Sequence, residues 1–143
     1  MSSDRDATVR LITEVEAQGK VAAIYDDIKQ TKGIETVPNM WRALASCPEN
    51  LEMIWSRLKT LMHPESVGRQ SPLDPKTREI IALAVSTTNG CEYCINSHTA
   101  ALRRLGCDTE ALGEVMAIIA LFNSTNALAD GYQIKPDVLP PLE

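Results

Sequence analysis

The sequence predicts an all-α protein, a compact bundle of about six helices in a single domain over residues 1–143. Apolar residues recur three and four positions apart in several segments of helical length. No segment alternates apolar and polar residues over the length of a strand, and the β-tolerant Ser-Thr-Thr stretch at 86–88 is too short to form one. Aromatic residues are only 4% of the chain, whereas alanine and leucine, which allow helices to pack closely, are abundant.

Turn signals divide the first half of the chain into three predicted helices. The first covers residues 20–31 and ends at Gly33, because glycine readily takes the left-handed conformation found after helices. Pro38 occupies the first turn of a short second helix. The third helix begins at residues 46–49 and ends before the His-Pro pair at 63–64.

Three further helices are predicted in the second half, after a loop at residues 65–73. Asp74 is followed by proline, the combination of an N-cap acid and a residue suited to the first helical position. That fourth helix ends at the Asn-Gly pair 89–90. The fifth covers residues 91–105, and the sixth runs from its cap at Asp108 to about residue 130.

Two features mark the expected core. Trp41 and Trp55 each lie on the apolar stripe of a predicted helix, so we expect them in the core or at an interface rather than in a cofactor site. The uninterrupted apolar run at 115–122 is also expected in the core, shared in part between subunits. The tail at 135–143 contains three prolines and should be extended.

Charge and hydropathy exclude several classes of protein. The net charge is −5, from 14 basic and 19 acidic residues, and no basic patch could neutralise the phosphates of a nucleic acid. Uninterrupted apolar runs are far shorter than the ~20 residues that span a bilayer, and residues 1–6 are too polar for an export signal. We therefore expect a cytoplasmic protein with no membrane partner, whose four cysteines are thiols.

Two of the cysteines belong to a cluster that could carry chemistry. Cys91, Cys94 and His98 have the spacing i, i+3, i+7, which places them within roughly 60° of one another on a helix. Both sulfurs lie in the first turn, where unpaired N–H groups and the helix dipole favour a thiolate. His98 lies one turn beyond Cys94, within reach of its sulfur or of a bridging water.

A carboxylate should complete this cluster. If residues 89–90 form a tight turn between antiparallel helices, Glu79 lies near the level of residues 98–102. Each residue also has a purely structural interpretation. Glu79 could be a surface carboxylate paired with Lys76, and His98 could be a core histidine whose hydrogen bonds are made within the protein. The two cysteines could be small buried apolar residues or half of a zinc site. The common register of the two thiols and the imidazole favours redox chemistry over these alternatives.

The spacing Glu79-x11-Cys91-x2-Cys94-x3-His98 resembles the signature of the alkylhydroperoxidase D-like branch of the carboxymuconolactone decarboxylase superfamily. The resemblance implies an all-helical subunit that assembles into homo-oligomers, as trimers or hexamers. It also implies a peroxide-reducing activity in which the cysteine pair cycles between dithiol and disulfide. No metal, flavin or haem cofactor is implied.

Carried over by position, Cys94 matches the peroxidatic cysteine, Cys91 the resolving cysteine, and Glu79 and His98 the proton relay. The helix alone leaves the attacking thiol open, because the dipole favours Cys91 and the neighbouring base favours Cys94. We take Cys94. The well-studied alkylhydroperoxidase has a histidine where this chain has Tyr93, and tyrosine can donate a hydrogen bond but cannot act as a base near pH 7.

The sequence thus predicts a thiol peroxidase that acts on a small hydroperoxide and is regenerated by an external dithiol reductant. Two alternatives stay open. One is a decarboxylase or lactone-processing enzyme in which the cysteines are incidental, and the other is a non-catalytic redox sensor whose disulfide changes the oligomeric state. Cys47 and Cys107 are interpreted as inert thiols without a role.

Overall fold

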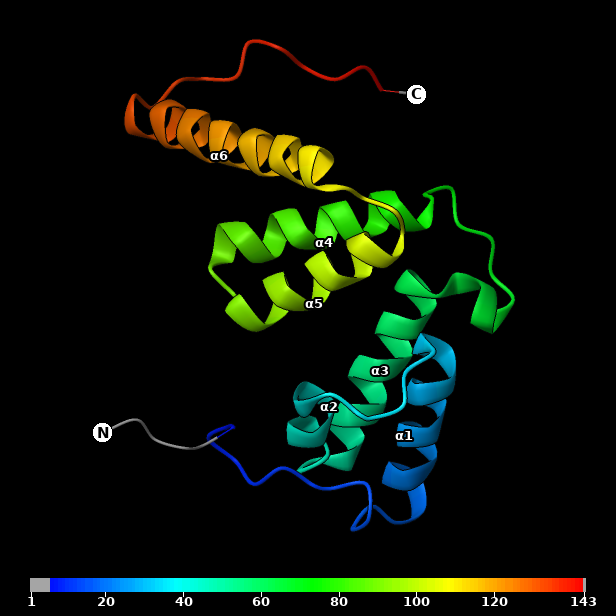
Figure 1. Ribbon diagram of the computed structural model, residues 1–143. Coiled ribbons are helices and arrows are strands. Elements are labelled where there is room, and N and C mark those ends of the chain that lie inside the picture. Colours follow the sequence, from blue (N-terminus) through cyan, green and yellow to red (C-terminus); the bar gives the residue numbers. More distant parts are fainter. Residues whose placement is uncertain (1–5, 143) are drawn as a thin grey trace. The chain divides into compact units, whose positions relative to one another are not determined.

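The structure, a computed structural model, describes residues 6–142 and has no β-strand among them (Figure 1). The predicted all-α class and the number of helices are confirmed. Six α-helices and one short 3-10 helix, η1, follow one another along the chain. Their bounds are α1 Gly19–Lys32, α2 Asn39–Leu44, α3 Pro48–Met62, η1 Pro64–Val67, α4 Pro75–Asn89, α5 Glu92–Arg104 and α6 Thr109–Gly131.

The predicted capping residues set several of these boundaries. Asp74 accepts a hydrogen bond from the backbone N–H of Thr77 at 3.0 Å and so begins α4. Asp108 begins α6 in the same way, as an acceptor for the third residue beyond it. Gly33 and Gly90 follow α1 and α4 with φ of 63° and 70°, the left-handed region that glycine occupies without strain.

Two segments differ in part from the expected connections. The start of the predicted loop at 65–73 belongs to η1, whose first turn is stabilised by a hydrogen bond from Ser66 Oγ to the His63 carbonyl. The tail at 135–142 has no regular structure, as its prolines predict, and Glu143 lies outside the described residues. The first five residues, in which no export signal is expected, also lie outside them.

Residues up to Pro72 and residues from Leu73 onward form two compact units, each with its own core. In the first, the rings of Trp41 and Trp55 meet edge to face with centroids 5.2 Å apart. Both are buried in this core, one of the two expected positions, beside Ile28 and Leu51. The assignment of the whole chain to one domain stays a prediction.

Hydrogen bonds between Asp27 of α1 and two residues of α3 link these helices at the edge of the first core. Asp27 accepts hydrogen bonds from Trp55 Nε1 at 2.7 Å and from Lys59 Nζ at 2.7 Å. Burial acts to raise the pKa of Asp27, but the hydrogen bonds from Lys59 and Trp55 outweigh it, so the pKa lies below its ordinary value. Tyr25 donates from its hydroxyl to the Ile12 carbonyl at 2.9 Å and holds the preceding segment against α1.

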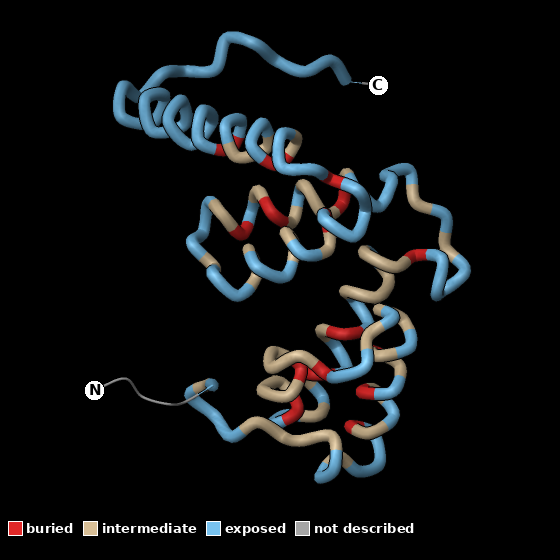
Figure 2. The backbone as a smooth tube through the Cα atoms, viewed as in Figure 1, coloured by how far each residue is buried: buried red, intermediate tan, exposed pale blue. Residues whose placement is uncertain are grey.

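The second unit consists of α4, α5 and α6 around a small core of Leu83, Leu102, Cys107 and Leu112. Within its own unit the run at 115–122 lies only partly in the core, and the expectation that it is shared between subunits stays a prediction. Of that run only Ile119 is buried. Most of α6 is exposed (Figure 2). The reason is that one face of α6 packs on the unit, while its other face, also apolar, has no partner within it.

Within residues 6–142, α6 is the one helix long and apolar enough to cross a membrane by length and composition. The expectation from the sequence rested on uninterrupted apolar runs alone. Helix α6 is longer than any such run because most of the polar residues that interrupt its apolar segments are small and uncharged. A single helix of this kind is weak evidence for a membrane span.

Candidate active site

The hairpin of α4 and α5 forms the frame of the candidate site. Gly90 ends α4, and Cys91 caps the start of α5, so the connection between the two helices is two residues long. The Cys91 N–H donates to the Ser86 carbonyl at 2.9 Å, which fixes the start of α5 against the last turn of α4. The helices run antiparallel, and residues equally far from the turn lie opposite one another (Figure 1).

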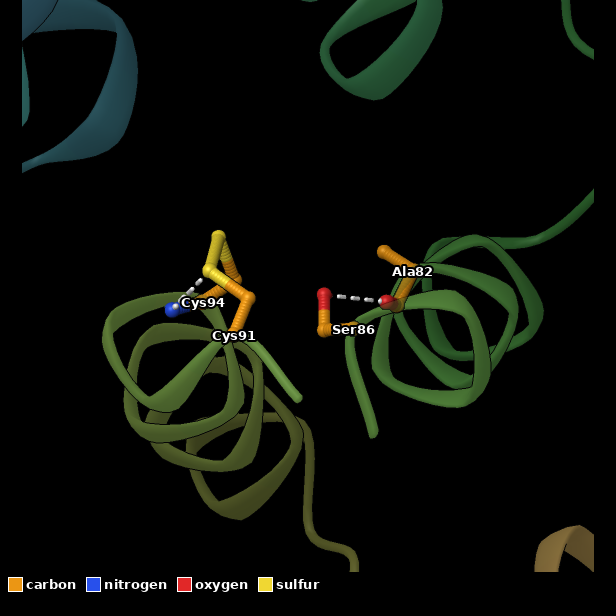
Figure 3. The surroundings of a disulfide bond; sticks show 4 residues. All are labelled: Ala82, Ser86, Cys91 and Cys94. Carbon is orange, nitrogen blue, oxygen red and sulfur yellow. Dashed lines mark hydrogen bonds between the residues drawn. A yellow bond between two sulfur atoms is a disulfide. The ribbon is translucent and has the colours of Figure 1, made fainter. Parts of the chain in front are cut away.

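The cysteine pair lies at the N-terminus of α5, as the sequence predicts. Cys91 Sγ accepts a hydrogen bond from the Cys94 N–H at 3.3 Å, so a sulfur takes the place of the usual N-cap oxygen. The two sulfurs are joined in a disulfide, with the Cα atoms 5.3 Å apart (Figure 3). Both residues are half-buried.

Glu79 and His98 meet across the hairpin. Glu79 Oε2 lies 2.7 Å from His98 Nδ1, and the two side chains are 16% and 24% exposed. The expected proximity of the two residues is confirmed, and the partner of Glu79 is His98 rather than Lys76. When the carboxylate accepts the Nδ1 proton, the ring is held in the tautomer that leaves Nε2 free to accept a proton.

The four predicted residues therefore form two pairs in one hairpin. Cys94 and His98 are four residues apart on α5, one turn along the same face. In the described part of the chain no hydrogen bond joins the sulfur pair to Glu79 and His98. The geometry assembles a disulfide-bonded cysteine pair at a helix N-terminus and a carboxylate–imidazole pair one turn away.

Sequence reasoning does not single out Ser86, which lies on the side of α4 that faces the disulfide (Figure 3). Its side chain is buried, and its Oγ donates to the Ala82 carbonyl at 2.7 Å. Its own carbonyl accepts the Cys91 N–H. Its position in the sequence could have identified it. Ser86 lies five residues before the N-cap Cys91, in the last turn of α4, and a connection of two residues brings that turn beside the start of α5.

The other two cysteines lie elsewhere. Cys107 is buried among the leucines of the second core and Cys47 is exposed at the start of α3. Among residues 6–142 no three His, Cys, Asp or Glu side chains are grouped so that they could hold a metal ion. A surface depression of about 400 Å³ lies in the first unit, along residues 6–11 and Arg42, and includes no residue of the candidate site.

A comparison with known families decides the classification. The model of the carboxymuconolactone decarboxylase family matches residues 57–134, which is more than half of the chain and includes all four candidate residues. The chain belongs to this family. Its match extends from the second half of α3 to the residues just beyond α6.

Individual relatives of the carboxymuconolactone decarboxylase family place the chain in the alkylhydroperoxidase D-like branch. A crystal structure described as the alkylhydroperoxidase AhpD core from Rhodospirillum rubrum is 45% identical, with a TM-score of 0.84 over 93% of this chain and 96% of that one. The alkyl hydroperoxide reductase AhpD of Streptomyces avermitilis is 28% identical over 127 residues, 85% of this chain and 68% of that protein. The uncharacterized protein YdfG of Bacillus subtilis is 41% identical over 49 residues, only a third of its length.

Proposed function

We propose that this member of the alkylhydroperoxidase D-like branch reduces organic hydroperoxides with the dithiol of Cys91 and Cys94. The observation that carries the proposal is the position of this pair at the N-terminus of α5, one turn from a histidine that is paired with a carboxylate. The names of the relatives agree with it, because several are called alkyl hydroperoxide reductases.

The N-terminus of α5 supports a reactive thiolate. The Cys94 N–H already points at Cys91 Sγ, and the aligned peptide dipoles of the helix add partial positive charge there. Such surroundings lower the pKa of a thiol towards neutrality, which increases the fraction of the nucleophilic form in the reduced protein. The two cysteine residues are half-buried rather than enclosed in the core, which is compatible with the approach of a small peroxide.

The pair of Glu79 and His98 supplies the proton transfer. Glu79 accepts the Nδ1 proton of His98 and orients the ring, so Nε2 is the basic nitrogen available to the thiol of Cys94. The low exposure of both side chains keeps water from competing for this hydrogen bond. His98 is the group that touches the reacting thiol in this scheme, and Glu79 is a positioning residue.

The reaction balances with these groups. The Cys94 thiolate attacks the terminal hydroxyl oxygen of ROOH, the O–O bond breaks, and the alkoxide leaves as ROH after it takes the proton that His98 accepted from the Cys94 thiol. Cys94 is then a sulfenic acid, which the Cys91 thiol attacks with release of water to form the disulfide. An external dithiol reduces the disulfide by exchange. Since this cycle needs a reducing thiol pool and the chain has two further free thiols, we propose the cytoplasm as its compartment.

A second candidate function follows from the name of the family, which describes a decarboxylase. In that case the cysteines would be incidental, and turnover of a cyclic carboxylate would survive their replacement. A non-catalytic redox sensor would form the disulfide but would not turn over peroxide.

The test is peroxide consumption in the presence of a small dithiol, for the wild-type chain and for C94S, C91S and C47S. We expect C94S to lose turnover and C91S to react with peroxide once, stopping at the sulfenic acid. Cys47 is the matched control, because it is an exposed thiol outside the hairpin, so C47S should turn over peroxide as fast as the wild-type chain. Full turnover by C94S would refute the assignment.

A further inference from the structure

The proposed reaction needs a second thiolate, at Cys91, which His98 does not serve. Cys91 must lose its proton before it can attack the sulfenic acid, because the thiolate and not the thiol is the nucleophile. His98, whose ring is held by Glu79, lies seven residues beyond Cys91, which is about 10 Å along the axis of α5. The imidazole is therefore placed for Cys94, one turn away, and Cys91 needs another source of stabilisation.

Cys91 already has one hydrogen-bond donor. Its Sγ accepts the Cys94 N–H at 3.3 Å, at the N-terminus of α5. Hydrogen bonds to the charged form of an acid lower its pKa, and each added donor lowers the pKa further. A second donor beside Cys91 would thus increase the fraction of its thiolate in the reduced protein.

Ser86 is the neighbour of Cys91 across the hairpin turn. Its carbonyl accepts the Cys91 N–H at 2.9 Å, so the two backbones are in contact, and both side chains are short. Ser86 is 8% exposed and lies on the side of α4 that faces the disulfide (Figure 3). The hairpin therefore places a side-chain O–H donor next to Cys91.

The hydroxyl of Ser86 can change its acceptor at little cost. It donates to the Ala82 carbonyl at 2.7 Å, four residues earlier in α4. In an α-helix that carbonyl already accepts the N–H of residue 86, and a bond from a serine side chain to the same oxygen adds little stability. Rotation about the Ser86 Cα–Cβ bond therefore turns the hydroxyl towards Cys91 and leaves no carbonyl without a donor.

We propose that the Ser86 hydroxyl turns from the Ala82 carbonyl to the Cys91 sulfur when the disulfide is reduced, and stabilises Cys91 as a thiolate. In the disulfide the Cys91 sulfur is uncharged and a weak acceptor, so the hydroxyl stays on the carbonyl. In the dithiol, a hydrogen bond to a charged acceptor is about twice as strong as one to a neutral acceptor. The thiolate therefore draws the hydroxyl away from Ala82.

This inference deepens the proposed peroxidase activity and rests on it for one step. The Cys91 thiol first loses its proton to solvent. The thiolate attacks the sulfur of the Cys94 sulfenic acid, the S–S bond forms, the S–O bond breaks, and the hydroxide becomes water with a proton from solvent. Each thiol then has its own partner for ionisation, His98 for Cys94 and Ser86 for Cys91.

The first test measures the pKa of each thiol without peroxide. In a C94S chain, the pH dependence of alkylation by iodoacetamide, mapped by mass spectrometry, gives the pKa of Cys91, and a C91S chain gives that of Cys94. We expect S86A to raise the pKa of Cys91 by about one unit and to leave that of Cys94 unchanged. T88A is the matched control, because Thr88 is an exposed hydroxyl residue of α4 about 200° round the helix from Ser86, and it should change neither pKa.

The second test separates the hydrogen bond from a change in packing. It measures the equilibrium between disulfide and dithiol in buffers of reduced and oxidised dithiothreitol, for the wild-type chain, S86A and T88A. A rise of one unit in the Cys91 pKa makes the dithiol of S86A about tenfold less favoured at a pH above both thiolate pKa values. Below both values the thiol is protonated in each protein, so the difference should vanish. A change in packing alone would shift the equilibrium equally at every pH.

The third test follows single steps of turnover. In S86A, attack on peroxide by Cys94 should keep its rate, while the Cys94 sulfenic acid accumulates and is trapped by dimedone. Its failure to accumulate while S86A still consumes peroxide would overturn the proposal. So would an unchanged Cys91 pKa in S86A, equal shifts for both thiols, an equal shift in T88A, or a shift in the reduction equilibrium that is the same at every pH. Because the first two tests need no peroxide, a chain that consumes none would refute the proposed activity alone.

Discussion

Replacing Glu79 by glutamine changes one property of the proposed proton relay. Glutamine keeps the shape of the side chain, and its carbonyl oxygen can still accept the Nδ1 proton of His98, but the acceptor is no longer charged. Hydrogen bonds to a charged partner contribute about 1.5–3 kcal/mol, compared with about 1 kcal/mol for neutral pairs. Because Glu79 is only 16% exposed and its oxygen lies 2.7 Å from the ring, little of this difference is screened by water.

The expected loss is therefore about 1–1.5 kcal/mol of stabilisation of the protonated imidazole, or about tenfold in kcat/KM for peroxide reduction. Glu79→Ala leaves the general base His98 without the partner that orients it, and should cost about 100-fold, the smaller end of the contribution that general acid–base catalysis makes. The assay is steady-state reduction of an organic hydroperoxide with a small dithiol as reductant. Stopped-flow mixing of the reduced protein with peroxide isolates the attack step.

Glu110→Gln is the control, because Glu110 is an exposed carboxylate in the first turn of α6, outside the hairpin. Its rate should equal that of the wild-type chain within about twofold. A Glu79→Gln variant as fast as the wild-type chain would refute the role of the carboxylate. An equal loss in Glu110→Gln would show that net charge, not the pairing with His98, controls the rate.

Two further predictions concern stability. Asp27→Asn should lower the free energy of unfolding by about 1–2 kcal/mol at pH 7 in denaturant titrations, because Trp55 and Lys59 lose a charged acceptor. Since the pKa of Asp27 is lowered in the folded protein, this stabilisation is present above the unfolded value near about pH 4 and disappears as the pH falls through the folded value. A difference from the wild-type chain that does not shrink as the pH is lowered below about 4 would contradict this cause. Gly90→Ala should cost about 1 kcal/mol and a few degrees in Tm, because φ is 70° there although the space for a methyl group is open. Gly113→Ala, in a helix with equally open space, should be neutral or stabilising, and equal losses in both variants would exclude backbone strain as the reason.

The fold could be predicted where local chemistry determines it. Asp74 and Gly90 are cap residues whose preferences depend on the backbone immediately around them, and the structure uses both as predicted. The meeting of Glu79 and His98 could also be predicted, because a two-residue connection fixes the register of an antiparallel hairpin. Once the hairpin is inferred, counting residues in both directions from its turn shows which residues of the two helices lie opposite each other.

Which side of a helix is buried depends on what that side contacts, and the periodicity of apolar residues does not reveal the contact. The run at 115–122 is apolar, and its composition is the same whether the partner is the same chain or another copy. Ile119 faces inward and Leu121 outward because α4 covers only one side of α6. Ser86 could not be identified from the sequence for a different reason. Its hydroxyl donates a hydrogen bond within its own helix, and no sequence motif includes it.

The most direct measurement counts thiols in the unfolded chain before and after the reduced protein meets an organic hydroperoxide. Of the four cysteines, we expect two to disappear with one equivalent of peroxide, and a mass map should place the new bond between Cys91 and Cys94. One alcohol should form for each disulfide, and added dithiol should restore the count and a second turnover. Four thiols that persist while peroxide is consumed, or a peroxide that is not consumed at all, would contradict a dithiol peroxidase.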